Sequence, residues 1–312
     1  MTEFELIGRL IPKLPTNAQM VLGAGDDCAI LNTQNPDQEM LFKTDSVVEN
    51  VHFNADTPPE KVGRKAMARC LSDIAAMAGQ PTVGLVTIGL PMGFDPSWVE
   101  RCYDGLRSVA QQFGVAIAGG ETTRSPGATF LSITLLGFIP KGRRALRSKA
   151  AVGDAVFVTG ELGGSIEGRH LDFEPRLAEA SWLAEHFDLH ALIDISDGLA
   201  GDLGHVLNAS KVGSELFAPT IPIARAAKLR ARNLGDAKTP LLAALTDGED
   251  FELLFTVPGS QAVQLADAWR EQFPLLKLSC IGKITAELGL RLRDANGVRI
   301  LPTHGFTHFT ER

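Results

Sequence analysis

Short apolar runs alternate along the chain with segments whose apolar positions recur at helical spacing. Residues 82–90 (TVGLVTIGL) form a continuous apolar run bounded by polar and turn residues, which predicts a buried strand. Similar runs near 115–118 and 129–139 predict two more strands. The first part of the chain is therefore expected to build a sheet.

Helical patterns precede and separate these strands. Thr57-Pro58-Pro59-Glu60 has the spacing of a capping box with proline at the first helical position, and it predicts a helix through about Ala78. Asp95-Pro96 predicts the start of a second helix. The apolar stripe of that helix is expected at Val99, Leu106, Val109 and Phe113.

A second series of elements begins after a polar segment. The run 155–159 (AVFVT) predicts a strand, and residues 160–164 follow it as a glycine-rich turn. Further strands are expected near 251–257 and 278–284.

Residues 140–144 (PKGRR) are polar and turn-rich, and they predict a domain boundary. We expect a mixed α/β (α+β) fold in two similarly sized domains, residues 1–142 and 143–312.

Composition narrows the classes of function. The 312 residues are 45% hydrophobic and carry a formal charge of −7, which argues for a packed core and against nucleic acid or an anionic membrane as the main partner. The longest apolar runs are about half as long as a membrane-spanning helix. Four scattered cysteines form no CxxC pair, which is typical of a reducing cytoplasm.

Candidate chemistry lies in carboxylates beside glycine or small residues. Asp27 stands in a glycine-rich segment, where a plain surface turn is the alternative. Asp45 is expected at the end of an apolar strand, a common position for ligand sites, although an exposed strand end would look the same. Asp73 lies in an alanine-rich helix end, where a buried charge must be paired or bind a metal.

Two more segments continue this pattern. Glu121 follows Gly119-Gly120 after a short apolar run, and Asp194 and Asp197 flank a serine at a predicted strand-to-helix turn. A loop with a helix N-cap is the alternative for both. Oxygen ligands select hard cations, and scattered aspartates suit Mg²⁺ with bound phosphates better than a protein cage for Ca²⁺. No Walker A sequence is present, so an ATP enzyme of this kind would carry phosphates on metal ions.

Taken in order, the segments resemble those of the thiamine-monophosphate kinase family over essentially the whole chain. The motifs are GAGDDCA, KTDSVVENVHF, LSDIAAMAG, AGGETT, GRRALRSKA, VTGELGGS, DISDGLAGDL, TDGEDFELLFTV and GFTHF. The resemblance implies the two-domain fold of the aminoimidazole-ribotide synthetase superfamily. Its N-terminal domain would pair with a second copy in a homodimer, and its C-terminal α/β domain would close over the nucleotide.

The resemblance also implies roles for individual residues. The expected Mg²⁺ ligands are Asp27, Thr44, Asp45, Asp73, Glu121, Asp194 and Asp197. The expected ATP contacts are Gly120, Glu121, Arg147 and Ser196. The expected thiamine monophosphate contacts are His52, Glu249 and Phe306. Taken alone, a histidine in this position is more often a packed or surface histidine than a functional one.

The chain departs from the family pattern at four positions. Glu121 stands for the usual aspartate, Lys43 for a small hydroxyl residue, Asp247 for glycine and Phe251 for tyrosine. Residues 43 and 45 of a strand point to one face, so we expect the Lys43 ammonium to pair with a carboxylate near Asp45.

Three functions remain open at this point. The first is ATP-dependent phosphorylation of thiamine monophosphate, the second is the reaction of a sister synthetase, and the third is non-catalytic nucleotide binding. The VENVHF and GFTHF segments favour the first.

Overall fold

The computed structural model describes residues 3–233 and 238–303. The chain divides into two compact units. Residues 19–144 and 168–181 form what we call the N-terminal unit, and residues 1–18, 145–167 and 182–312 form the C-terminal unit. Each is described by itself. Among the described residues no helix is long and apolar enough to span a membrane.

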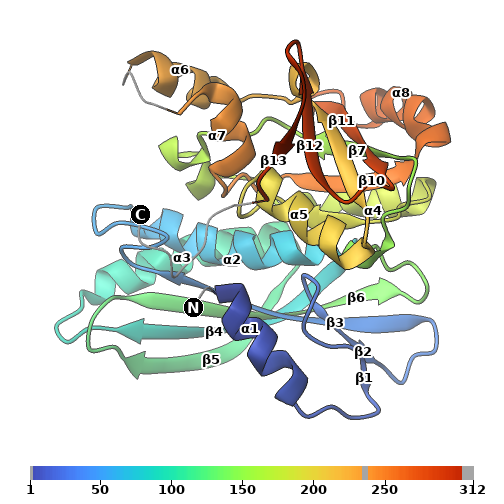
Figure 1. The fold of residues 1–312 in the computed structure, drawn as a ribbon. Helices are drawn as coiled ribbons and strands as arrows, with labels where there is room; N and C mark the ends of the chain where they lie inside the picture. The colour runs from blue at the N-terminus through green and yellow to red at the C-terminus, as the bar shows by residue number, and fades with distance from the viewer. Residues whose placement is uncertain (1–2, 234–237, 304–312) are drawn as a thin grey trace. The chain divides into compact units, whose positions relative to one another are not determined.

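The N-terminal unit is built on a six-stranded sheet in the order β1-β2-β3-β6-β4-β5 (Figure 1). Neighbouring strands are antiparallel except β4 and β5, which run parallel and place β5 at one edge. The strands are β1 (Met20–Leu22), β2 (Ala29–Asn32), β3 (Gln38–Val48), β4 (Gln80–Leu90), β5 (Ala116–Arg124) and β6 (Phe130–Pro140). The strands predicted at 82–90 and 129–139 are confirmed, and that near 115–118 is longer than expected.

Helices α2 (Pro59–Ala76) and α3 (Pro96–Gln112) pack against one face of this sheet (Figure 1). Two glycines let their backbones approach closely. A Cβ atom at Gly63 would lie 1.8 Å from the carbonyl oxygen of Cys102, and one at Gly105 would lie 1.9 Å from that of Glu60. No other residue fits at these contacts without moving the backbone.

The helix starts are only partly as predicted. The capping box is wrong, because Pro58 is the N-cap residue of α2 and no side chain caps that helix. Thr57 instead accepts a hydrogen bond on Oγ1 from the Asn54 amide, 3.0 Å away. For α3 the prediction is confirmed, since the Asp95 carboxylate accepts from the Ser97 amide at 2.9 Å.

Two predicted strand ends are also wrong. β3 continues to Val48, so Asp45 lies inside the strand rather than at its end. β5 continues through Gly119, Gly120 and Glu121 to Arg124. Pairing of β3 with β6 and of β5 with β4 supplies hydrogen bonds that extend both strands beyond their apolar runs.

The sheet face opposite α2 and α3 exposes apolar side chains. Phe42 and Leu85 are 45% and 48% exposed, and almost every residue of the edge strand β5 is exposed. Exposed apolar side chains that share one sheet face can mark an interaction site.

The C-terminal unit contains a seven-stranded sheet in the order β13-β12-β9-β11-β7-β10-β8. Its strands are β7 (Asp154–Thr159), β8 (Leu192–Asp194), β9 (Gly213–Phe217), β10 (Leu253–Pro258), β11 (Leu278–Thr285), β12 (Gly289–Asp294) and β13 (Gly297–Leu301). Helix α5 (Leu199–Ser210) packs with the core that includes Val156, Val158 and Leu254. The alternate residues Phe157 and Phe255 stack on each other with ring centroids 5.6 Å apart.

The remaining described helices are shorter. They are α1 (Glu3–Leu10), α4 (Leu177–His186), α6 (Arg225–Asn233), α7 (Pro240–Thr246) and α8 (Ala262–Gln272). Short 3-10 helices are η1 (Ile11–Lys13), η2 (Arg147–Lys149), η3 (Ser165–Glu167), η4 (Arg169–Leu171), η5 (Ala218–Thr220) and η6 (Gly259–Gln261). The predicted mixed α/β class is confirmed.

Candidate active site

Two buried carboxylates lie close together in the N-terminal unit. Asp27 stands between β1 and β2, and Asp73 stands in the last turn of α2. They are 4% and 8% exposed, and their carboxylate oxygens lie within 4.8 Å of each other. Like charges so close and so buried require a cation nearby.

Lys43 supplies one positive charge to this pair. Its Nζ lies 2.7 Å from Oδ1 of Asp73. Burial by itself lowers the pKa of Lys43, but the carboxylates of Asp73 and Asp45 outweigh it and hold that pKa above its usual value. The ammonium is therefore charged at neutral pH. The predicted ion pair of Lys43 with a neighbouring carboxylate is confirmed, and Asp73 is its partner.

Asp45 is held by a second cation. Arg69 of α2 binds it with Nε 2.9 Å from Oδ2 and Nη2 3.4 Å from Oδ1. Burial raises the pKa of Asp45, but the charges of Arg69 and Lys43 outweigh it and lower that pKa. The prediction that residues 43 and 45 share a face is confirmed, because both side chains reach α2.

Thr44 points the other way. Its hydroxyl is exposed and lies 3.3 Å from the hydroxyls of Ser132 and Thr134 on the neighbouring strand β6. Alternation along β3 therefore separates the Thr44 side chain from the carboxylates of Asp45 and Asp73.

Helix α2 contacts strand β3 and the loop after it through three charged side chains spaced four residues apart. Arg69 binds Asp45 and Asp73 binds Lys43, as described. Lys65 is fully buried and donates from Nζ to the carbonyl oxygen of His52, 2.6 Å away. All three lie along one side of the helix, since residues four apart are neighbours on its surface.

His52 itself is oriented by the loop that follows β3. Its Nδ1 accepts a hydrogen bond from the Val48 amide at 3.1 Å. In the neutral ring this contact places the proton on Nε2. Asn50 turns the chain with φ of 65°, and its amide donates to the carbonyl oxygen of Phe53 at 2.8 Å.

Gly120 and Glu121 lie on the exposed edge strand β5. A Cβ atom at Gly120 would lie 1.8 Å from the carbonyl oxygen of Val86, and the residue has φ of 156°, so glycine is required there. The Glu121 carboxylate accepts a hydrogen bond from the Thr122 amide at 3.0 Å. Both residues line a hollow of about 360 Å³ beside Tyr103.

Acidic residues also gather in the C-terminal unit, where β8 turns into α5. Asp194 ends β8, and Asp197, Asp202 and His205 place ligand atoms within 4.8 Å of one another. Burial, followed by the charges of Asp197 and Asp194, raises the pKa of Asp202 well above its usual value, against a smaller opposing effect of Arg147. Carboxyl groups are therefore crowded at this end of the sheet, where a bound cation would stabilise their charged forms.

The segment that contains Glu249 packs on this turn in a strained conformation. Glu249 and Phe251 have φ of 52° and 51°, which is uncommon for residues other than glycine. The Glu249 amide donates to the carbonyl oxygen of Ser196 at 2.7 Å, and the Phe251 amide donates to that of Ile195 at 2.8 Å. These bonds join the predicted substrate and metal segments.

The glycine turn after β7 joins the same assembly. The buried Glu252 accepts a hydrogen bond from the Thr159 hydroxyl at 2.7 Å, and the buried Asp250 accepts from the Gly163 amide. Three motifs far apart in the sequence, VTGELGGS, DISDGLAGDL and TDGEDFELLFTV, thus meet in the C-terminal unit. Strand pairing of β10 with β7 and β8 brings them together.

These donor sets fit hard divalent cations. Asp27 and Asp73 carry two negative charges against one from Lys43, and their ligand atoms are all oxygens. The turn after β8 adds a second cluster of carboxyl groups. Asp45 is a less suitable ligand for a divalent cation, because Arg69 already binds both of its carboxylate oxygens.

Cysteines beside the carboxylates do not offer a nucleophile. Burial, and then the charge of Asp73, raises the pKa of Cys28 and of Cys70 well above the usual range. Both remain thiols at neutral pH.

Some functional positions were not found in the sequence, and one could not be placed. Phe306 lies outside the described residues. Lys65, Arg69, Asp202 and Asp250 were missed. The four-residue spacing of Lys65, Arg69 and Asp73 was a usable signal, because it places three charges on one side of a helix.

Comparison with known proteins gives consistent results. The model of the family described as AIR synthase related protein, N-terminal domain, matches residues 25–139. The chain is 39% identical over 300 residues to the thiamine-monophosphate kinase of Rhodopirellula baltica, which covers 93% of this chain and 92% of that relative.

Two solved structures are similar over nearly the full length. A structure described as AaThiL complexed with AMPPCP and TMP has a TM-score of 0.79 at 29% identity, covering 99% of this chain and 97% of that chain. The thiamine-monophosphate kinase from Stenotrophomonas maltophilia has a TM-score of 0.74 at 31% identity, covering 93% and 96% respectively.

Proposed function

This chain belongs to the thiamine-monophosphate kinase family, and we propose from that membership that it transfers the γ-phosphoryl group of ATP to thiamine monophosphate, giving thiamine diphosphate and ADP. The observation that carries the proposal is the retained site chemistry, with Asp27 and Asp73 buried together and a third carboxylate, Asp194, buried in the C-terminal unit. A similar solved structure contains AMPPCP, a methylene analogue of ATP, together with TMP.

The acceptor chemistry needs no general base. The attacking atom is a phosphate oxygen of thiamine monophosphate, which is anionic at neutral pH. The bond from the γ-phosphorus to the bridging oxygen of ATP breaks as the new phosphorus–oxygen bond forms, and ADP takes the electron pair. The difficulty is the approach of two polyanions, so catalysis consists mainly of positioning and charge neutralisation.

We propose that Mg²⁺ is the cofactor and that it neutralises charge on the phosphates when bound. Asp27 and Asp73 are the best candidates to hold it in the N-terminal unit, and Asp194 and Asp197 in the C-terminal unit. Thr44, Asp45 and Glu121 remain proposed ligands. Of these, Thr44 and Glu121 are exposed, and Asp45 is bound by Arg69.

The substrate contacts are proposed from membership of the family. Gly120, Glu121, Arg147 and Ser196 would contact ATP, and His52, Glu249 and Phe306 would contact thiamine monophosphate. The charge of Arg147 acts on Asp202, which supports a position near the acidic turn. We also propose residues 1–142 as the ATP- and Mg²⁺-binding, dimerising domain and residues 143–312 as the domain that closes the active site.

A coupled assay for ADP tests the function. Purified protein with ATP and Mg²⁺ is expected to release ADP with thiamine monophosphate, and chelation of the metal by EDTA is expected to stop the release. Aminoimidazole ribotide precursors and selenide serve as substrates of the sister enzymes. ADP release with one of those, and none with thiamine monophosphate, would assign the chain to another reaction.

The position of Lys43 leads to a prediction about the Mg²⁺ concentration that the reaction requires. Because its ammonium sits 2.7 Å from Asp73, it takes part of the role of a cation. In Lys43→Ser we expect the Mg²⁺ concentration for half-maximal turnover to change by about fivefold or more, upward if the charge is simply lost. Counting bound Mn²⁺ by electron paramagnetic resonance then shows whether an extra ion replaces the ammonium. The matched control is Lys141→Ser, which removes an exposed lysine. An unchanged metal titration and ion count would contradict this role.

We propose that the chain forms a homodimer through the open face of the N-terminal sheet. Two observations support this dimer. The apolar side chains of Phe42 and Leu85 are exposed on this face, and such side chains are commonly covered by a partner. The edge strand β5 is also exposed. Sedimentation velocity measures the mass directly, and a species of 33.4 kDa at micromolar concentration would contradict dimerisation.

Together with its substrates, the four free cysteines support a cytoplasmic location.

A further inference from the structure

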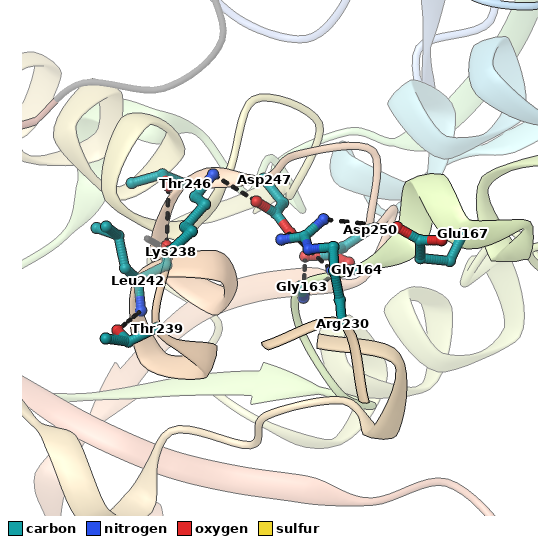
Figure 2. A network of polar contacts seen from close by, with 10 residues as sticks. All are labelled: Gly163, Gly164, Glu167, Arg230, Lys238, Thr239, Leu242, Thr246, Asp247 and Asp250. Carbon is teal, nitrogen blue, oxygen red and sulfur yellow. Dashed lines mark hydrogen bonds and ion pairs between the residues drawn. The ribbon is translucent and has the colours of Figure 1, made fainter. Parts of the chain in front are cut away.

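Asp247 is the centre of a polar network in the C-terminal unit (Figure 2). Its Oδ2 lies 2.6 Å from Nη2 of Arg230 and accepts a hydrogen bond from the Gly164 amide at 2.9 Å. Its Oδ1 pairs with the ammonium of Lys238. One carboxylate therefore ties together α6, the residue before the N-cap of α7 and the glycine turn after β7.

The network is well shielded from water. The side chains of Asp247, Arg230 and Lys238 are 6%, 13% and 31% exposed. Asp247 is also the C-cap residue of α7, where a negative charge meets the negative end of the helix. A carboxylate at this place is favourable only because two cations contact it. Charge-assisted contacts of this kind are stronger than neutral hydrogen bonds.

Asp250 makes a parallel contact three residues later. Its two carboxylate oxygens accept from the Gly163 amide at 3.1 and 2.9 Å. Gly163 and Gly164 have φ of 84° and 72°, and a Cβ atom at either would lie 2.6 Å from a backbone nitrogen. The two carboxylates thus hold consecutive amides of a turn that cannot rearrange to accept side chains.

Glu249 lies between these two anchors. Gly248, Glu249 and Phe251 all have positive φ, of 76°, 52° and 51°. Residues other than glycine, here Glu249 and Phe251, are strained in this region, and they persist only where surrounding contacts impose the conformation. Asp247 before Glu249 and Asp250 after it supply such contacts.

We propose that Asp247 is a positioning residue, which holds residues 247–251 on the glycine turn through Arg230, Lys238 and Gly164 and so sets the Glu249 carboxylate for thiamine monophosphate. The inference rests on the proposed function, in which Glu249 contacts that substrate. The affinity for thiamine monophosphate would then depend on the ion pairs of Asp247 with Arg230 and Lys238.

The test compares Asp247→Ala with Asp247→Asn. Alanine removes the charge and the acceptor, whereas asparagine keeps an acceptor for the Gly164 amide. We expect KM for thiamine monophosphate to rise about tenfold in the alanine variant and about threefold in the asparagine variant, with kcat and KM for ATP within about twofold of wild type. Glu215→Ala is the matched control, because it removes a carboxylate of β9 in the same unit, which pairs with Arg293 of β12. It should leave both KM values unchanged.

Hydrogen exchange provides a readout that does not need turnover. Amides of residues 247–251 should exchange at least about tenfold faster in Asp247→Ala than in wild type or in Glu215→Ala. Unchanged exchange, or equal rises in KM for both substrates, overturns the positioning role. If wild-type protein releases no ADP with thiamine monophosphate, the proposed function fails. In that case the hydrogen-exchange rates alone test whether Asp247 holds residues 247–251 in place.

Discussion

Asp73→Asn is expected to lower turnover with thiamine monophosphate by a factor of about 100 or more, because a metal's charge stabilisation of the transition state contributes several kcal/mol. Asparagine has nearly the same shape, so the packing of α2 on the sheet should survive. Turnover at saturating ATP and Mg²⁺, with circular dichroism to confirm folding, measures the effect.

The ion pair with Lys43 requires a second variant. Asp73→Asn leaves the Lys43 ammonium without the partner 2.7 Å away, and an unpaired buried charge is costly by itself. The double variant Lys43→Met/Asp73→Asn removes that charge as well. If Asp73 is a metal ligand, the double variant stays about as inactive as the single one. Recovery of turnover in the double variant, or near-normal turnover in the single one, would make Asp73 a structural partner of Lys43.

The second large effect concerns the acceptor. We expect kcat/KM for thiamine monophosphate to exceed that for free thiamine by about 1000-fold or more, since general base catalysis typically contributes 10²–10⁴-fold and an alcohol acceptor needs it. A phosphate oxygen is already anionic. The groups near Asp73 suit the phosphate, because Lys43 is a charged ammonium and the buried thiols stay protonated.

The measurement uses equal concentrations of the two acceptors and follows their products separately by chromatography. ADP release alone is insufficient, because slow ATP hydrolysis would also produce it. A reaction without acceptor is therefore the control. Efficient formation of thiamine monophosphate from free thiamine would show that a base operates, and the mechanism proposed above would be wrong.

Elements with strong local sequence patterns were predicted correctly. The run at 82–90 and the start of α3 at Pro96 appear as expected, because apolar continuity and the Asp95 cap are local signals. The start of α2 was misjudged, because Thr57 has the right spacing for a capping box but bonds to Asn54 instead. The short strand β9 and the hairpin of β12 and β13 were not predicted. β9 depends on pairing with the distant strands β11 and β12, and the same β9–β12 pairing joins the hairpin to the sheet.

The types of residue in the candidate site could be predicted from the sequence, but the side chains with which they pair could not. Alternation along β3 correctly placed Lys43 and Asp45 on one face. Which carboxylate Lys43 would bind depended on the packing of α2 on the sheet. The pairing of Arg69 with Asp45 depended on the same packing, and nothing local to residues 41–48 indicates it. The anchors of Glu249 were hidden for a similar reason, because Gly163 and Asp250 are 87 residues apart.

The spacing of Lys65, Arg69 and Asp73 along α2 has an evolutionary consequence. Each successive residue of an α-helix is rotated by about 100° and advanced by 1.5 Å. Inserting or deleting one residue upstream of Lys65 within the helix would shift all three charges together, away from His52, Asp45 and Lys43. Point substitutions can accumulate along this helix, but a change in its length would break three contacts in a single step. The length of α2 should therefore drift more slowly than its composition.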